Sequence, residues 1–230
     1  MATRQEQFKR REEEILMTAE RLLLESLDGD LTLDALAAQL DVAKGTLYKH
    51  FDSKDELLLK ILIRHEEWLF VMNRIDDGAA AAIARIVLQA LMYPNQSALY
   101  TRLEERLASV AGLNRTFASL YQIRRERMAR LSQIAEQYLS EAASEMSVES
   151  YLVSLWSLGQ GGANLLNSSF YQRYIGKRDA LSLTLVEQAL LLPYLHVKAS
   201  SAKATTTDTA DTVATPTKNS IHPSVELPIL

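Results

Sequence analysis

Apolar residues at helical spacing are the feature that most constrains the fold of this chain. In residues 10–27 the apolar side chains recur three or four positions apart and share one helical face, at Ile15, Ala19, Leu22 and Leu23. The same spacing continues to about residue 195, and the two-residue alternation typical of strands does not recur. Because 47% of the 230 residues are hydrophobic, such helices can bury a substantial core. The sequence therefore predicts an all-α protein.

Composition and missing motifs exclude several function classes. The sequence has no cysteine, which excludes disulfides, thiolate zinc sites and a cysteine nucleophile. The histidines are too far apart in the sequence to predict a metal site: His50, His65, His196 and His222. Neither a Gly-x-Ser-x-Gly elbow nor a His-Glu-x-x-His motif is present. We therefore expect no metal, no cofactor and no enzymatic activity.

Charge and hydropathy bear on location and partners. The N-terminal segment is too polar for a signal peptide, and no run of about 18 apolar residues could span a membrane. A cytoplasmic protein without membrane contact is predicted. Its formal net charge of −4 is the wrong sign for general coating of nucleic acid, so any contact with DNA must be local.

Two short helices joined by a turn are predicted after the first helix, which should end near residues 28–30. Thr32 is a suitable N-cap for the second helix, whose buried stripe would be Leu33, Leu36, Ala37 and Leu40. Asp41 and Val42 interrupt the pattern, and a third short helix is expected over residues 43–50. This layout is that of a helix-turn-helix.

A long fourth helix is expected to begin near residue 54. Ser53 and Glu56 have the capping-box spacing Ser-x-x-Glu, which satisfies backbone N–H groups at a helix start. An apolar run at helical spacing follows: Leu57, Leu58, Ile61, Leu62, Trp68 and Leu69. The fourth helix would therefore brace the helix-turn-helix from its C-terminal side.

The stretch "TLDALAAQLDVAKGTLYKHFDSKDELL" carries a more specific pattern, with its core at Gly45, Thr46, Leu47, Tyr48, His50, Phe51, Ser53, Lys54 and Leu57. This stretch closely resembles the N-terminal domain of the tetracycline-repressor (TetR-like) family of transcriptional regulators. The resemblance covers roughly residues 12–62, and beyond them the chain agrees with the family only in its helical pattern. It implies a DNA-binding domain over residues 1–62 and a helical ligand-binding and dimerisation domain over residues 63–197.

Contacts with DNA are expected from the turn and the third helix. Glycine at position 45 would let the helix approach the major groove closely, despite costing about 1 kcal/mol of helix propensity relative to alanine. Lys44, Thr46 and Lys49 lie early enough to reach base edges. By resemblance, Tyr48, His50 and Lys54 correspond to phosphate-contacting positions. The complete predicted set is Thr32, Ala43, Lys44, Gly45, Thr46, Tyr48, Lys49, His50 and Lys54.

Two features leave alternatives open at this DNA-binding end. Residues 1–60 contain nine Lys/Arg against 13 Asp/Glu, so the positive charge must be segregated onto one face, and the lysines could instead form an ordinary solvated face. The family often has serine or threonine where this chain has Ala43, so one cap and one phosphate contact are in doubt. An N-terminal basic cluster could contact DNA as an arm or be a frayed, solvated terminus: Arg4, Lys9, Arg10 and Arg11.

The second domain is predicted to consist of further helices. The expected segments are residues 76–94, ended by Pro94, and residues 97–112, 114–143, 147–176 and 179–195. Residues 198–230 are rich in Thr, Ala and Ser and cannot bury enough apolar area to offset their ordering entropy. They are predicted to be a disordered tail.

Family resemblance implies a small-molecule inducer, largely apolar, in a pocket of the second domain. The candidate pocket residues are Trp68, Met72, Tyr100, Phe117, Tyr121, Met128 and Trp156, with Arg124 able to anchor an acid. Each of these side chains is also a candidate for ordinary core packing. The segment "GQGGANLLNSS" lacks the phosphate-loop pattern and a preceding strand, so nucleotide binding is not expected.

A smooth helical face of small residues is predicted to pack closely against another helix, either its symmetry mate or the final helix of the same chain. Resemblance implies that the last two long helices of each subunit form a four-helix dimer interface. The residues predicted for this interface are Leu155, Gly159, Gly162, Ala163, Leu166 and Leu185. The sequence therefore predicts a homodimeric, ligand-responsive regulator, a repressor, that binds an inverted-repeat operator in double-stranded DNA. The alternative is a DNA-binding structural or interaction protein without an inducer.

Overall fold

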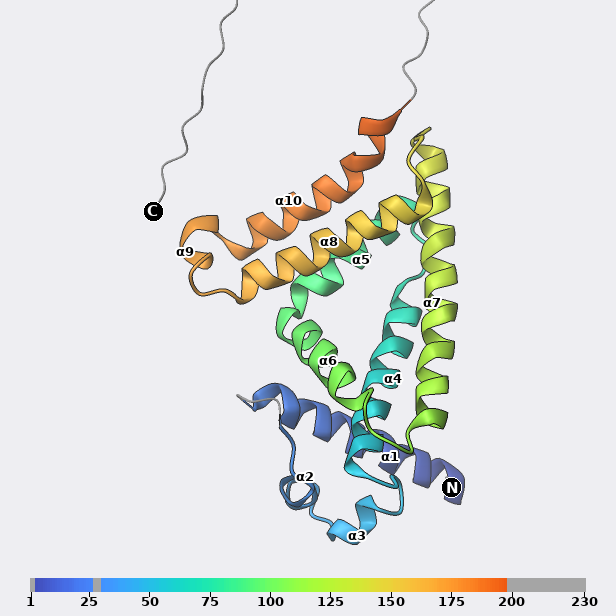
Figure 1. Ribbon diagram of the computed structural model, residues 1–230, viewed down its shortest axis with the longest axis vertical. Helices are drawn as coiled ribbons and strands as arrows, with labels where there is room; N and C mark the ends of the chain where they lie inside the picture. The colour runs from blue at the N-terminus through green and yellow to red at the C-terminus, as the bar shows by residue number, and fades with distance from the viewer. Residues whose placement is uncertain (1–2, 27–29, 198–230) are drawn as a thin grey trace, which may run out of the picture. The chain divides into compact units, whose positions relative to one another are not determined.

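The computed structural model describes residues 3–26 and 30–197 of the 230-residue chain. These ranges contain helices and no strand, so the all-α prediction is confirmed (Figure 1). The predicted tail, residues 198–230, lies outside the described residues. The helices are α1 (Arg4–Glu25), α2 (Leu33–Gln39), α3 (Lys44–Leu47), α4 (Lys54–Met72), α5 (Ala79–Met92), α6 (Pro94–Leu107), α7 (Asn114–Glu141), α8 (Val148–Asn167), α9 (Gln172–Ile175), α10 (Arg178–Leu191) and the 3-10 helix η1 (Leu192–His196).

Helix α1 begins earlier than the apolar pattern indicates. Thr3 and Glu6 form a capping box in which the Glu6 N–H donates to Thr3 Oγ1 over 3.2 Å and the Thr3 N–H donates to Glu6 Oε2 over 2.6 Å. The basic cluster of residues 4–11 is therefore the first two turns of a capped helix and not a frayed terminus. Contact of this cluster with DNA stays a prediction.

The turn of the helix-turn-helix is built from backbone hydrogen bonds. The Thr32 hydroxyl caps α2 as predicted, accepting from the Ala35 N–H over 3.2 Å. At the other end Asp41 has a φ of 51°, and the Asp41 and Val42 N–H groups donate to carbonyls of the last turn, Ala38 and Ala37. These bonds form a Schellman motif, which aspartate tolerates better than most residues. The chain is thereby turned from α2 into α3.

Helix α3 is shorter than predicted, and α4 begins where predicted. Residues 48–50 have a turn conformation rather than the expected helix, because each N–H of Lys49 and His50 bonds a carbonyl only three residues back. Ser53 caps α4 by accepting from the Glu56 N–H over 3.0 Å. The Glu56 carboxylate accepts from the Asp52 N–H over 2.6 Å, one residue before the usual capping-box partner.

Two hydrophobic cores divide the helices differently from the predicted domain boundary. The first core joins α1–α4 with α6 and the beginning of α7, through side chains such as Leu99, Leu103 and Leu120. The second core joins α5, the end of α7, α8 and α10. The boundary predicted between residues 62 and 63 lies inside α4, which packs alongside α7 (Figure 1). Helices α4 and α7 therefore connect the DNA-binding end to the rest of the protein.

The segment predicted as one helix over residues 147–176 is interrupted after Asn167, and α9 is a single short turn before Gly176, whose φ is 84°. Within α8, Gly162 faces two other helices of the same protomer. A Cβ at this position would lie 2.4 Å from Leu185 Cδ1 of α10 and 2.5 Å from Leu91 Cδ2 of α5. The close helix packing predicted from the small residues is therefore present, and it joins α8 to α5 and α10 of the same subunit.

The six residues predicted for the dimer interface are all buried inside the protomer: Leu155, Gly159, Gly162, Ala163, Leu166 and Leu185. A buried side chain has no surface to offer to a second subunit. Periodicity identified a packing face correctly, but it could not distinguish a face packed within the chain from one packed against a partner.

Candidate functional site

The predicted DNA-contacting residues lie between the N-cap of α2 and the first turn of α4, and most of them belong to α3 or to the residues directly before and after it. Leu47 and Phe51 are buried and anchor this segment on the first core. The neighbouring side chains Lys44, Tyr48 and Lys49 are exposed. A Cβ at Gly45 would have no atom within 4 Å, so the backbone here is open to close approach. Ala43 is the N-cap residue of α3 and provides no side-chain hydrogen bond.

Two of the predicted DNA-contacting lysines are paired with carboxylates. Lys44 Nζ lies 2.9 Å from Asp34 Oδ2, and Lys54 Nζ lies 2.9 Å from Asp30 Oδ1. The hydrogen bond that Lys44 donates to Asp34 raises the pKa of Lys44, and the hydrogen bond that Asp30 accepts from Lys54 lowers the pKa of Asp30. Exposed pairs of this kind contribute little stability. A DNA phosphate can therefore replace either carboxylate at small cost.

The remaining predicted DNA contacts differ in exposure. The Thr32 side chain is exposed but serves as the cap of α2, and Thr46 is half-buried. His50 stacks on Phe8 of α1 with 4.1 Å between ring centroids, and its Nδ1 is buried without a hydrogen-bond partner among the described residues. Burial lowers the pKa of His50. The early turns of α1 thus lie against the turn that follows α3.

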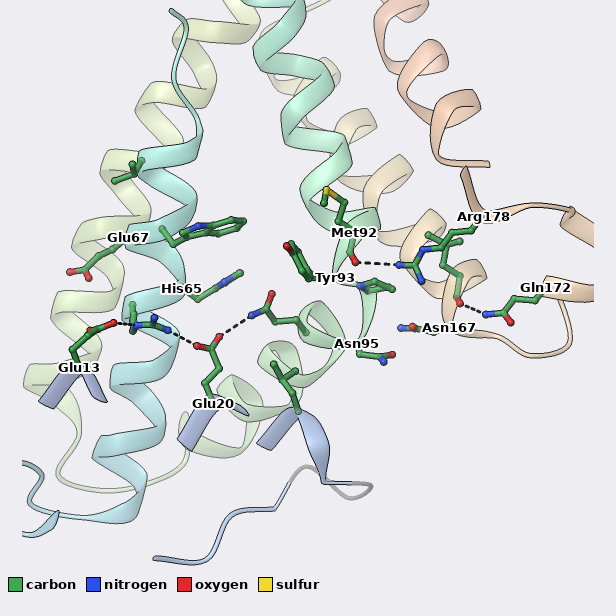
Figure 2. Close-up of a pocket in the computed structure, with 17 residues that line it drawn as sticks. Glu13, Glu20, His65, Glu67, Met92, Tyr93, Asn95, Asn167, Gln172 and Arg178 are labelled. Atoms are coloured by element: carbon green, nitrogen blue, oxygen red, sulfur yellow. Dashed lines mark hydrogen bonds and ion pairs between the residues drawn. The ribbon is translucent and has the colours of Figure 1, made fainter. Parts of the chain in front are cut away.

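A large cavity lies where α1, α4 and α6 meet the ends of α8 and α10. It has a volume of about 1050 Å³ and is lined by polar, aromatic and aliphatic side chains (Figure 2). One wall carries Glu13, Glu20 and His65, and the opposite wall carries Gln172 and Arg178. The Arg178 guanidinium donates to the carbonyl oxygens of Leu91 and Met92, which ties the start of α10 to the end of α5.

A second, smaller cavity of about 310 Å³ adjoins the first and is lined by residues of α4, α5, α6, α7 and α8. The two cavities share His65, Trp68, Tyr93 and Gln96. Burial lowers the pKa of His65 to about 4, so its imidazole is neutral at pH 7. Of the predicted pocket residues, Trp68 lines both cavities and Trp156 lines the smaller one.

The other predicted pocket residues line neither cavity: Met72, Tyr100, Phe117, Tyr121, Arg124 and Met128. Phe117 belongs to the first core and stacks on Tyr121 with 5.9 Å between centroids. Met128 packs against the second core. Sequence reasoning missed Asn73, Gln89 and Arg127, all of which line the smaller cavity. No local sequence pattern marks them, because their role comes from packing of separate helices.

Arg124 is held by carboxylates instead of anchoring an acidic ligand. Its Nε lies 2.9 Å from Glu66 Oε1, and its two Nη atoms donate to the Glu104 carboxylate over 2.5 and 2.7 Å. Glu66 is buried and also accepts from Arg127 Nε over 2.7 Å. Two arginines and two glutamates thus form a neutral network that joins α4, α6 and α7.

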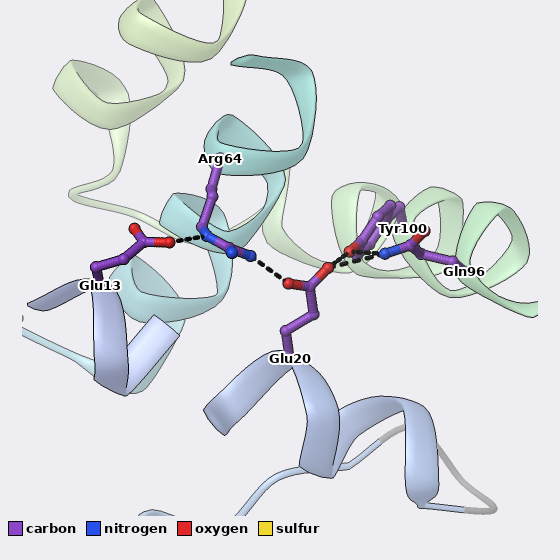
Figure 3. Close-up of polar contacts among 5 residues, drawn as sticks. All are labelled: Glu13, Glu20, Arg64, Gln96 and Tyr100. Carbon is purple, nitrogen blue, oxygen red and sulfur yellow. Dashed lines mark hydrogen bonds and ion pairs between the residues drawn. The ribbon is translucent and has the colours of Figure 1, made fainter. Parts of the chain in front are cut away.

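A second network connects the larger cavity to α1 (Figure 3). Arg64 of α4 donates to Glu13 through Nε and to Glu20 through Nη1, both over 2.5 Å. Glu20 also accepts hydrogen bonds from Gln96, over 2.8 Å, and from the Tyr100 hydroxyl of α6. Burial and the hydrogen bond to Glu20 raise the pKa of Tyr100. One carboxylate of α1 is therefore held jointly by α4 and α6.

Within residues 3–26 and 30–197, no helix is long and apolar enough to cross a membrane. The same ranges also contain no group of three or more His, Asp or Glu side chains arranged to hold a metal ion.

Comparison with known proteins places these features in context. Residues 15–61 match the N-terminal domain of "Bacterial regulatory proteins, tetR family". The solved structure of a bacterial regulatory protein in the tetR family from Rhodococcus RHA1 is 19% identical and superposes with a TM-score of 0.58, over 79% of this chain and 96% of that one. A TetR transcriptional regulator from Rhodococcus sp. RHA1 is 21% identical over 77% and 94% of the two chains, with a TM-score of 0.41.

No curated protein gives a significant match. The matched segment runs from α1 into α4 and contains the complete helix-turn-helix, and the first Rhodococcus structure shares the fold of most of the chain. The helix-turn-helix segment is therefore similar to the tetR family of bacterial regulatory proteins, and most of the chain shares its fold with a protein of that family.

Proposed function

We propose that this chain is a homodimeric, ligand-responsive repressor that binds an inverted-repeat operator. The observation that carries the ligand response is the network around Glu20. Arg64 and Gln96 line the larger cavity, and both donate to this carboxylate of α1. A molecule in the cavity that contacts either side chain competes with those hydrogen bonds. Cavity occupancy is thereby connected to the helix that packs behind the helix-turn-helix.

For ligand binding in the cavity to alter DNA binding, the ligand must bind two conformations of the protein with different affinities. A ligand weakens DNA binding only by the factor with which it prefers the DNA-incompetent arrangement of α1 and α4. Electrophoretic mobility shifts on the DNA flanking the gene, with and without a small-molecule panel, test this directly. DNA binding that no compound alters would favour the alternative, a regulator without an inducer. Glu20→Gln should reduce the response of DNA affinity to any active compound.

Contacts with DNA are proposed to divide between base reading and backbone positioning. Lys54 lies in the first turn of α4, so Lys54→Ala should weaken binding to all sequences and reduce the salt slope by about one phosphate contact. Lys44→Ala should affect the cognate site more than random DNA. Asp34→Asn provides the matched control, because it frees Lys44 and should raise affinity up to about fivefold at low salt. Equal losses for both lysine variants on every DNA would contradict this division.

Dimerisation is proposed through the outward faces of α8 and α10. Val153, Leu183 and Leu191 are 56%, 59% and 60% exposed, an unusual amount of apolar surface for helices at the end of a domain. On α8 this face also includes Gly161, where a Cβ would meet no atom within 4 Å. Two such helices can approach a partner closely at the glycine.

Neighbouring glycines provide the test of this interface. Gly161→Leu has room in the protomer and gains helix propensity of about 1 kcal/mol, but it should block a close helix contact and shift the sedimenting species to a monomer. Gly162→Leu should instead overpack Leu91 and Leu185 and cost about 1–3 kcal/mol of stability. Operator affinity should fall with loss of the dimer, because each subunit reads one half-site. A Gly161→Leu protein that remains dimeric would place the interface elsewhere.

A further inference from the structure

The smaller cavity contains two polar side chains that the protein leaves unsatisfied. Asn73 is only 1% exposed, and its Oδ1 has no hydrogen-bond partner among the described residues. Gln89 Nε2 is likewise buried without a partner there. Both residues line the cavity. A buried polar group without a partner costs about 1–3 kcal/mol, so a ligand that donates to one and accepts from the other removes a cost the free protein carries.

The walls of this cavity favour a flat, apolar body. Trp68, Tyr93 and Trp156 line it together with aliphatic side chains such as Ile86 and Leu155. Trp68 and Tyr93 meet edge to face with 6.4 Å between ring centroids. Aromatic faces in this arrangement stack well on a planar ring system. The volume of about 310 Å³ is at the lower end of the range for ligand sites, which limits the ligand to a few fused rings.

The charges around the cavity balance. Arg127 is its only charged lining residue within the described ranges, and Glu66 pairs with it. Glu66 is shared with Arg124, which also holds Glu104, so the network has equal numbers of positive and negative groups. His65 is neutral at pH 7, as shown above. An anion would find no unpaired cation and a cation no unpaired carboxylate, while each would lose its hydration.

We infer that the smaller cavity binds a neutral, fused-ring aromatic lactam or amide, whose N–H and C=O groups pair with Asn73 and Gln89. Each carboxamide side chain has both a donor and an acceptor, so a ligand amide complements the pair. The regulatory meaning of this site rests on the proposed ligand response, but binding itself can be measured separately.

Intrinsic fluorescence reports on this cavity through both tryptophans, and on the larger cavity through Trp68 alone. The sequence contains two tryptophans, and both Trp68 and Trp156 line the smaller cavity. The full-length chain is titrated with quinolin-2-one, its N-methyl derivative, quinoline-2-carboxylate and N-methylquinolinium. Quinolin-2-one should bind tightest. The N-methyl derivative lacks the N–H donor and should bind at least about tenfold more weakly, and the two ions should bind more weakly still.

Matched variants assign the hydrogen bonds. Asn73→Leu and Gln89→Leu should each reduce the affinity for quinolin-2-one about tenfold and change the affinity for the N-methyl derivative much less. Removal of an unpaired polar atom should leave the thermal midpoint unchanged or higher, which separates loss of binding from loss of folding. Gln160→Leu is the control, because Gln160 lines the same cavity but already accepts a hydrogen bond from Ser97 over 3.2 Å. Its effect should be below about twofold.

Several outcomes overturn the inference: no binding of quinolin-2-one, equal binding of the N-methyl derivative, or tighter binding of either ion. Preference for the cation, lost on Glu67→Gln, would assign binding to the larger cavity, where Glu13, Glu20 and Glu67 exceed Arg64 and Arg178 by one charge. Operator binding is measured in parallel. Lactam binding without an effect on DNA supports the binding site and contradicts a regulatory role for the smaller cavity, whereas DNA release that Asn73→Leu does not alter contradicts the lactam chemistry alone.

Discussion

The DNA-binding end and the cavity region of this protein differ in how their functional residues are distributed along the chain. The candidate DNA contacts lie between Thr32 and Lys54, within two helices, a turn and the start of a third. The smaller cavity takes its lining from His65 to Gln160, on five separate helices. A function encoded in a continuous segment leaves a sequence pattern, whereas a function assembled across helices does not.

Both regions leave buried polar atoms unpaired among the described residues, but in different surroundings. At the DNA-binding end, His50 Nδ1 is unpaired and the imidazole stacks on Phe8, while side-chain caps and exposed ion pairs satisfy other polar groups. In the cavity region, the unpaired atoms are Asn73 Oδ1 and Gln89 Nε2, in residues that line the smaller cavity. The difference is that the unpaired atoms of the cavity region belong to residues around an open space, whereas the imidazole of His50 is covered by a ring.

The largest expected effect tests whether the cavity region depends on contacts between distant residues. Glu66 joins α4 to arginines 58 and 61 positions later in the sequence. Glu66→Gln leaves Arg127 without its charge partner and should cost about 2–4 kcal/mol of unfolding free energy, measured by urea denaturation. Glu67→Gln changes the exposed neighbouring residue and should cost less than about 0.5 kcal/mol. Equal costs for the two variants would contradict the importance of the buried network.

A pH titration sharpens the same comparison. Burial lowers the pKa of His65 in the folded protein to about 4 from 6.5, so between these values the unfolded chain binds the proton more readily. Stability should therefore fall as the pH decreases through this window, by about 2 kcal/mol between pH 7 and pH 5 from this group. His65→Gln should remove that part of the slope, as followed by urea denaturation at each pH.

His50 provides the internal comparison, because burial lowers its pKa in the same direction at the DNA-binding end. His50→Gln should remove less of the slope than His65→Gln, since His50 lies at the edge of the fold against Phe8. A larger effect at His50 would mean that the DNA-binding end contributes more to acid sensitivity than the cavity region does.

The smallest expected effects concern helix caps at the DNA-binding end. Thr32→Ala removes the hydroxyl that caps α2 and should cost about 1 kcal/mol. Ala43→Ser adds a hydroxyl at the uncapped start of α3 and should gain about 0.5–1 kcal/mol in stability or in DNA affinity. Thermal midpoints and operator affinities of both variants check these values. No gain at position 43 would show that the serine hydroxyl reaches neither the α3 amides nor a phosphate.

The sequence predicted correctly those features that depend only on neighbouring residues. It predicted the caps at Thr32 and Ser53 and the absence of a cap at Ala43, because these depend on residues within one helical turn. It missed the beginning of α1, although Thr3 and Glu6 have the capping-box spacing, because the following residues are polar and lack an apolar stripe. It also identified the small-residue face of α8 but could not choose which helix covers it. Periodicity indicates that a helix face is buried, but it does not indicate which element packs on that face.

By itself, the sequence determined the all-helical fold and the helix-turn-helix, because helical periodicity, caps and the turn depend on short-range backbone and side-chain chemistry. Its resemblance to the TetR-like family added the expectation that this segment binds DNA. Only the tertiary structure decided that Arg124 is held by Glu66 and Glu104, that Gly162 packs inside the protomer, and that Asn73 and Gln89 lie unpaired in one cavity. Those outcomes depend on which helix faces pack together, and the packed helices are far apart in the sequence. Once a polar group is buried, its contribution to stability depends on whether the side chains packed around it offer a hydrogen-bond or charge partner.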